Sequence, residues 1–252
     1  MPAAREQSAP QRSQLLPVLK IPEFVVFATS QAVSLFGDKL DYMALLALIA
    51  YFSSRFGWDS TKAISYLSVV VALPVVLFGP LAGVLVDRWD RRKVMVVCDS
   101  CRAVLVLLIP FLTLLTDGFL IVYPIAFSVF LFGLFFNTAR LAIIPNLVGP
   151  DKVLGANSFM NIVGRLATFG GMVLGGLVVD WGGWSKVGIR PSWAAGFYLD
   201  SFSYFVSVVA LLFIFNRLAN SPRQRVASRT EVGLFIKEQS RMVASLKELW
   251  QI

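Results

Sequence analysis

Residues 64–93 read ISYLSVVVALPVVLFGPLAGVLVDRWDRRK, an apolar run that ends in a cluster of charged side chains. An α-helix rises about 1.5 Å per residue, so a run of this length can cross the roughly 30 Å of hydrocarbon in a bilayer. Basic side chains concentrated directly after such a run are typical of a loop that stays in the cytoplasm. The stretch therefore predicts a membrane-spanning helix followed by a short cytoplasmic loop.

Similar apolar runs lie on both sides of this stretch. They cover residues 24–52, 94–115, 119–144, 154–179 and 193–215. Apolar residues are almost continuous within each run, which favours helices over the strands of a membrane barrel, whose side chains alternate. The sequence predicts an all-α integral membrane protein in which residues 23–217 form a bundle of six transmembrane helices.

The two ends of the chain differ from these runs. Residues 1–22 are polar and are expected to form a cytosolic tail. Residues 218–252 are expected to form a cytosolic linker, in which apolar residues at helical spacing indicate an amphipathic helix at the membrane surface. This pattern has no helix-stop signal before residue 252, so we interpret the linker as truncated.

Composition and charge agree with a membrane protein. Hydrophobic residues make up 57% of the chain and charged residues 15%, against about 25% charged residues in an average soluble domain. A net charge of +8 can indicate a nucleic-acid partner, but Lys and Arg here lie mainly between and after the apolar runs. This placement predicts no nucleic-acid partner and puts both termini in the cytoplasm of a bacterial-type plasma (inner) membrane.

The sequence indicates neither a metal nor a cofactor. It contains no His, and Cys98 and Cys101 are its two cysteines, which are too few ligands for the usual four-ligand zinc site. No Gly-x-x-x-x-Gly-Lys-Ser/Thr loop occurs, which argues against ATP-driven pumping by this chain. A membrane-embedded enzyme is disfavoured as well, because no cluster of nucleophiles or metal ligands is evident.

A short pattern occurs twice in the chain. The run at residues 64–86 leads into Gly83-x-x-x-Asp87, and the run at 154–179 leads into Gly176-x-x-x-Asp180. These two runs cross the membrane in opposite directions. The pattern favours an arrangement of the six helices as two inverted three-helix repeats, a known design of transporters.

The charged loop resembles the signature loop of the major facilitator superfamily, Gly-x-Leu-x-Asp-Arg-x-Gly-Arg-Arg. The matching residues are Gly83, Leu85, Asp87, Arg88, Arg91 and Arg92. Asp90 replaces the second glycine, and this variant looks like the branch that contains macrolide-efflux proteins and the enterobactin exporter. The resemblance covers about residues 24–250 and implies the N-terminal half of a twelve-helix fold.

The resemblance implies a secondary active transporter, not an enzyme. The expected activity is proton-coupled efflux of a drug-like or siderophore-like small molecule by alternating access. In the family the loop carboxylate, here Asp87, braces one closed state by docking near a helix of the C-terminal half. That partner would come from a C-terminal six-helix half, which is missing here, or from a second copy. The alternative is a truncated or split membrane fragment that does not transport, or an assembly partner.

Glycines in the fifth run carry a second resemblance. Gly171-Met172-x-x-Gly175-Gly176 is similar to the Gly-Pro-x-x-Gly-Gly of family antiporters, with Met in place of Pro. Small residues at this spacing also allow helices to pack closely. Helix packing and an antiport-specific role both remain open for Gly171, Gly175 and Gly176.

Ionisable residues inside apolar runs are costly and are usually functional. Asp38 and Asp41 lie three apart on the first run, and Arg165 lies at a similar depth on the fifth, after Asn157 and Asn161. Our hypothesis is that Asp38 or Asp41 neutralises Arg165 beside a central cavity, where a carboxylate and Asn161 meet a proton or a cationic substrate. A purely structural ion pair is the alternative.

Two other pairings follow from the same rule. Lys39 is a rival partner for the carboxylates of the first run, although it points to another side of the helix. Asp99 and Arg102 lie one turn apart in the third run and are expected to pair locally.

Overall fold

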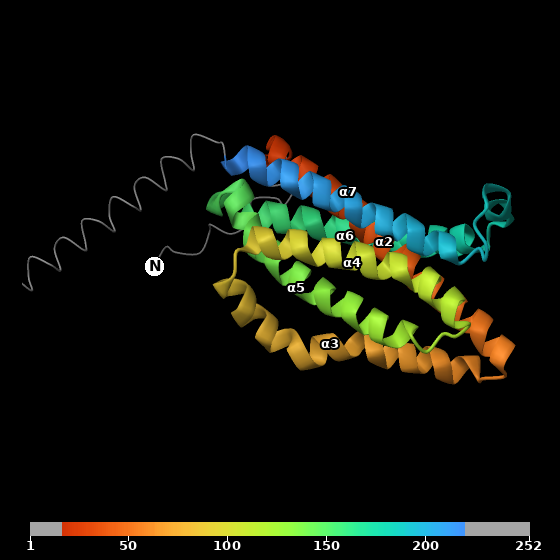
Figure 1. Cartoon of the computed structure of the whole chain (residues 1–252). Helices are drawn as coiled ribbons and strands as arrows, with labels where there is room; N and C mark the ends of the chain where they lie inside the picture. The colour runs from red at the N-terminus through yellow and green to blue at the C-terminus, as the bar shows by residue number, and fades with distance from the viewer. Residues whose placement is uncertain (1–16, 220–252) are drawn as a thin grey trace, which may run out of the picture. The chain divides into compact units, whose positions relative to one another are not determined.

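The computed structural model describes residues 17–219, and Figure 1 shows their path. The predicted amphipathic helix and most of the predicted tail lie outside these residues. The long helices are α2 (Pro22–Phe56), α3 (Ser60–Arg88), α4 (Arg91–Thr116), α5 (Val122–Val148), α6 (Val153–Asp180) and α7 (Ala194–Ala219). Short 3-10 helices, η1 (Pro150–Lys152) and η2 (Gly182–Val187), lie before and after α6.

The described residues contain helices and no strand, which confirms the predicted all-α class. Five helices, α3 to α7, are long and apolar enough to cross a membrane. The helix α2 is not among these five, and it carries Asp38, Lys39 and Asp41 in its middle. A sixth span therefore stays a prediction, and so does the arrangement as two inverted repeats.

Capping residues in the sequence explain where the helices begin and end. The side chain of Asp59 accepts hydrogen bonds from the backbone N–H groups of Thr61 and Lys62 and so caps α3. Asp90 caps α4 in the same way through the N–H of Arg92. Gly57 ends α2 with a φ of 67°, a left-handed conformation that glycine adopts without strain.

The helices pack as neighbouring pairs. The helix α6 lies along α2, and α5 packs against both α4 and α3 (Figure 1). The contacts described below lie within residues 17–211, which form one compact unit, whereas α7 from Leu212 onward belongs to a second unit.

Candidate functional site

The short loop between α3 and α4 is tied to α5 by one arginine. Asp87, in the last turn of α3, accepts a 3.3 Å hydrogen bond from a terminal nitrogen of Arg91. The other terminal nitrogen of Arg91 donates at 2.9 Å to the backbone carbonyl of Ala142 on α5. The side chain of Asp87 is still 70% exposed, so its free lone pairs can accept another donor.

The other residues of the predicted gating loop flank this contact. Arg88 is the last residue of α3, and Arg92 lies in the first turn of α4. A Cβ on Gly83 would meet nothing within 4 Å among the described residues. Gly83 therefore makes no close helix contact in this part of the chain, and its role in the loop stays a prediction.

The centre of the bundle holds an ion pair between α2 and α4. A terminal nitrogen of Arg102 lies 2.8 Å from Oδ1 of Asp38, and the same oxygen accepts a 2.6 Å hydrogen bond from the hydroxyl of Tyr204 on α7. The guanidinium also lies over the ring of Tyr204, 4.2 Å from its centroid, as in a cation–π contact. Three helices thus meet at one buried guanidinium.

A second carboxylate completes this network. Asp99 is fully buried and lies 3.4 Å from Arg102, so the predicted local pairing between them is present. The other oxygen of Asp99 accepts a 2.6 Å hydrogen bond from the hydroxyl of Ser207. Gln31 on α2 donates to Ser207 at 3.4 Å. The network therefore extends as a chain of hydrogen bonds from α4 through α7 back to α2.

Arg165 is not the partner of the carboxylates on α2, so that hypothesis is wrong. Asp38 pairs with Arg102, and neither Asp38 nor Asp41 forms an ion pair with Arg165 or Lys39 in the described residues. The physical reason is helix orientation, because α2 turns Asp38 toward Arg102 on α4 and Tyr204 on α7, whereas Arg165 on α6 lines the hollow among α2, α5 and α6.

Two glycines bring α2 and α7 into close contact. A Cβ on Gly37 would lie 2.8 Å from the Cβ of Ser203, and a Cβ on Gly196 would lie 2.6 Å from the Cβ of Ala44. Because residue 37 meets residue 203 while residue 44 meets residue 196, the two helices run in opposite directions here. Only glycine fits at these two points, since any side chain would push the backbones apart.

Asp41 and Asp200 lie on this interface, between the two glycine contacts. Asp41 is 3% exposed and Asp200 0% exposed, and the two carboxyl groups are close enough to interact electrostatically. Ser203 donates at 3.0 Å to Oδ1 of Asp200. Oδ1 of Asp41 and Oδ2 of Asp200 have no hydrogen-bond partner among the described residues. Two buried acids therefore lie within electrostatic range of each other, and each has one oxygen without a partner among the described residues.

A polar hollow of about 480 Å³ lies among α2, α5 and α6. Its lining includes the predicted residues Arg165 and Asn161, together with Arg140 on α5. Thr168 adds a hydroxyl, and the remaining side chains are apolar. The structure therefore places Arg165 and Asn161 together, as predicted, but beside Arg140 instead of beside a carboxylate of α2.

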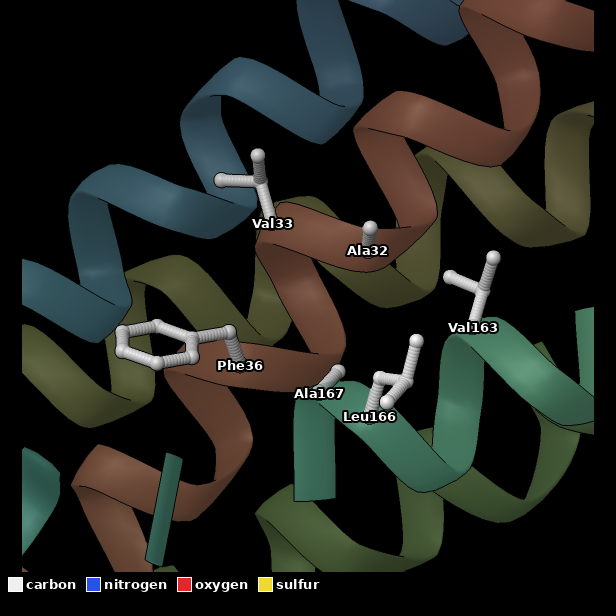
Figure 2. A pocket seen from close by; sticks show the side chains of 6 residues that line it. All are labelled: Ala32, Val33, Phe36, Val163, Leu166 and Ala167. Carbon is white, nitrogen blue, oxygen red and sulfur yellow. The ribbon is translucent and has the colours of Figure 1, made fainter. Parts of the chain in front are cut away.

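A second, apolar groove of about 430 Å³ lies between α2 and α6. It is lined by Ala32, Val33, Phe36, Val163, Leu166 and Ala167, and Figure 2 shows these side chains on the two neighbouring helices. The groove offers no polar group, so it gives a ligand no orienting contact.

The glycines of α6 differ in what they contact. A Cβ on Gly171 would lie 3.0 Å from the carbonyl oxygen of Phe36 on α2, and a Cβ on Gly175 would lie 3.0 Å from Cγ of Met43. Both positions therefore let α6 pack tightly on α2. A Cβ on Gly176 would meet nothing within 4 Å among the described residues, so the packing role is wrong for Gly176 there.

Sequence reasoning missed Asp200 and three other residues of the network, Gln31, Tyr204 and Ser207. The signal for Asp200 was present, because it is a lone acid inside the apolar run at 193–215. Arg140, in the run at 119–144, was missed in the same way. Tyr204 and Ser207 carry no such signal, since hydroxyl groups are common in buried helices and their partners lie far away in sequence.

Comparisons with known proteins agree with this description. Residues 30–251 match the family described as the Major Facilitator Superfamily. The uncharacterized MFS-type transporter YfiS of Bacillus subtilis is 27% identical over 224 residues, which are 86% of this chain and 50% of YfiS. The putative bacilysin exporter BacE of Bacillus subtilis is 34% identical over 189 residues, or 73% of this chain and 43% of BacE.

A shorter match links the chain to an efflux protein. Macrolide efflux protein A of Streptococcus pyogenes is 39% identical over 77 residues, which are 31% of this chain and 18% of that protein. No solved structure matches the chain significantly.

Apolar helices that are long enough to cross a bilayer and that enclose buried ion pairs are typical of a multi-pass membrane protein. The chain belongs to the Major Facilitator Superfamily, whose members are transporters and not enzymes. The resemblance to the macrolide-efflux branch is confirmed by these relatives. The chain spans about half the length of the curated relatives that it matches.

Proposed function

We propose that this chain is the N-terminal half of a proton-coupled exporter that moves a small molecule by alternating access. The similarity to a putative exporter and to an efflux protein supports export as the direction. In this proposal α2 is the sixth span, and the six helices form two inverted three-helix repeats. Both termini lie in the cytoplasm of a bacterial plasma membrane, because the basic residues gather in the loops on that side.

One observation supports proton coupling above the others, namely the excess of acids in the buried network. Asp38, Asp99, Asp41 and Asp200 lie within electrostatic range of the guanidinium of Arg102. A second arginine, Arg140, lies in range of Asp38 and Asp99. In a medium of low dielectric constant, four carboxylates are not all expected to stay ionised around two cations. Protons that bind and leave during transport are the simplest source of the missing positive charge.

The carboxylates also connect the helices whose movement would carry the substrate. Asp38 joins α2 to α4 and α7 through Arg102 and Tyr204. A proton on Asp38 would weaken its ion pair with Arg102, since the neutral acid has lost the Coulombic attraction. We propose that this step releases α2 from α4 and so links proton binding to the change between the two states.

The loop residue Asp87 has the proposed role of a latch. It is held at the end of α3 by Arg91, and most of its side chain is open to a further partner. We propose that this partner belongs to a C-terminal six-helix half. In one state the contact would hold the cytoplasmic side closed, and breaking it would let that side open.

The test is transport into everted membrane vesicles from cells that express the protein, with a panel of amphipathic fluorescent dyes. We expect dye uptake when the vesicle interior is acidified, loss of uptake after a protonophore, and loss of uptake in Asp38→Asn. The matched control is Asp117→Asn, which removes an exposed ion pair with Arg55 instead of a buried one. Uptake that survives the protonophore would contradict proton coupling.

The second candidate function is a membrane fragment or assembly partner without transport of its own. The observation that favours it is that the chain spans about half the length of its curated relatives. Vesicles that contain this chain alone would then show no gradient-driven uptake. Uptake that appears only when a second six-helix half is co-expressed would identify the chain as an assembly partner.

A further inference from the structure

The hollow among α2, α5 and α6 has an unusual distribution of charge. Two arginines line it, Arg140 from α5 and Arg165 from α6, and no acid does. Neither guanidinium forms an ion pair or a hydrogen bond with another residue in the described part of the chain. The carboxylate of Asp38 attracts Arg140 only from beyond contact distance.

The acids of the bundle cannot supply a binding site for a cation in this hollow. Asp41, Asp99 and Asp200 are at most 3% exposed. Asp38 is already bound by Arg102 and Tyr204. The charged residues that line the hollow are therefore both positive, which is the reverse of what a cationic substrate needs.

Arg165 lies deep in its helix, far from the level of the membrane surface. Arg165 lies about 18 Å along the axis from Val153, the first residue of α6. An arginine near the middle of a span is expensive unless an anion or water meets it. Lipid headgroups lie at the two edges of the bilayer, so they do not normally reach this level.

We propose that this hollow binds the anionic group of the transported substrate, a carboxylate or an anion of similar size, between Arg140 and Arg165. The forked guanidinium groups match the two oxygens of a carboxylate. Asn161 and Thr168 supply neutral hydrogen bonds, and Leu35, Met160, Phe169 and Met172 supply apolar contact for the remainder of the molecule. The substrate class is thus an amphipathic acid, and this inference rests on the proposed transport function.

The test compares two probes that differ in charge alone, dansylglycine and its neutral amide dansylglycinamide. Binding is measured by dansyl fluorescence with the whole chain in nanodiscs of zwitterionic lipid. We expect the acid to bind at least about tenfold more tightly than the amide, because hydrogen bonds to a charged group are stronger than those between neutral groups. Arg165→Gln should abolish this preference, and Arg165→Lys should restore part of it.

Lys62→Gln is the matched control, since it removes a cation from the first turn of α3, and it should leave the preference intact. Phosphatidylglycerol in place of the zwitterionic lipid distinguishes a lipid headgroup from a soluble anion. If that lipid abolishes binding of dansylglycine, a headgroup occupies the hollow and the proposal is overturned. Equal binding of the two probes would overturn it as well.

The binding assay separates this inference from the transport function. If vesicles show no transport but the chain still prefers the acid, the transport function fails and the anion site stands. If vesicles carry the amide as well as the acid, transport stands and the anion site is overturned.

Discussion

Oδ1 of Asp38 on α2 lies 2.8 Å from a terminal nitrogen of Arg102 on α4, although the two residues are 64 positions apart in sequence. The side chain of Arg102 is 7% exposed and that of Asp38 is 24% exposed. Water therefore reaches part of the Asp38 carboxylate, whereas the guanidinium of Arg102 is almost closed to it. The ion pair, together with the hydroxyl of Tyr204, connects α2, α4 and α7 at a single point.

Removal of the guanidinium should destabilise the bundle strongly. In Arg102→Leu the carboxylates of Asp38 and Asp99 stay buried without a cation, and loss of one partner of a buried pair costs about 3–5 kcal/mol. The free energy of unfolding in detergent micelles, followed by circular dichroism in increasing denaturant, measures this loss. Arg55→Leu is the control, because Arg55 belongs to an exposed pair that contributes at most about 1 kcal/mol. Equal free energies of unfolding for Arg102→Leu and Arg55→Leu would contradict a stabilising role of the buried ion pairs.

A side chain at residue 37 should separate α2 from α7. In Gly37→Ala the new Cβ would lie 2.8 Å from the Cβ of Ser203 and closer still to two polar oxygens of α7. Overpacking of this kind costs about 1–3 kcal/mol, measured as a lower free energy of unfolding. Gly79→Ala is the matched control, since a Cβ there meets nothing within 4 Å among the described residues. The proposed contact is refuted if both variants unfold at the same denaturant concentration.

The helices could be predicted from sequence because the signal for each one is local. The predicted run at 64–86 became α3 (Ser60–Arg88), and Asp59 and Asp90 fix helix starts through side chains that act within three residues. The partner of Asp38 could not be predicted in this way. Arg102 and Arg165 both lie inside apolar runs, and which of them faces Asp38 depends on how the helices are rotated against one another.

The sequence also contained a signal for two further residues that was not used in the prediction. Asp200 and Arg140 are single charges inside apolar runs, the same feature that singled out Asp38 and Arg165. Their effect differs because Asp200 is buried against α2, whereas Arg140 reaches the hollow. Whether a charged side chain is buried depends on helix packing. The sequence alone therefore cannot distinguish a buried charge such as Asp200 from one that lines the hollow, such as Arg140.

Neutralising the loop carboxylate should affect transport and not stability. In Asp87→Asn the pair with Arg91 is weakened, but an exposed pair contributes only about 0–1 kcal/mol. We expect an unfolding midpoint close to that of the unmodified protein and a large fall in dye uptake by vesicles. The control is Asp117→Asn, which breaks the exposed pair between Asp117, directly after α4, and Arg55 in the last turn of α2. This variant should leave uptake unchanged. Normal uptake in Asp87→Asn would remove the latch role.

Asp41 and Asp200 should behave differently from Asp38, although all three are acids on buried helix faces. Neither Asp41 nor Asp200 forms an ion pair in the described residues, and each has one oxygen without a hydrogen-bond partner. Replacing both by Asn removes two buried carboxyl groups that interact unfavourably, while keeping side chains of the same size. The double variant should therefore be as stable as the unmodified protein, or more stable.

The same double variant should nevertheless stop proton-driven uptake if these two acids carry the transported proton. The unfolding experiment and the vesicle assay must be compared. A double variant that folds normally but shows no uptake would identify the two residues as proton carriers and not as structural acids. A loss of several kcal/mol would show that the carboxylates hold α2 against α7. Stable protein with full gradient-driven uptake would show that the proton binds elsewhere. Asp38 and Asp99, whose ion pairs with Arg102 depend on their charge, would then be the remaining carriers in this network.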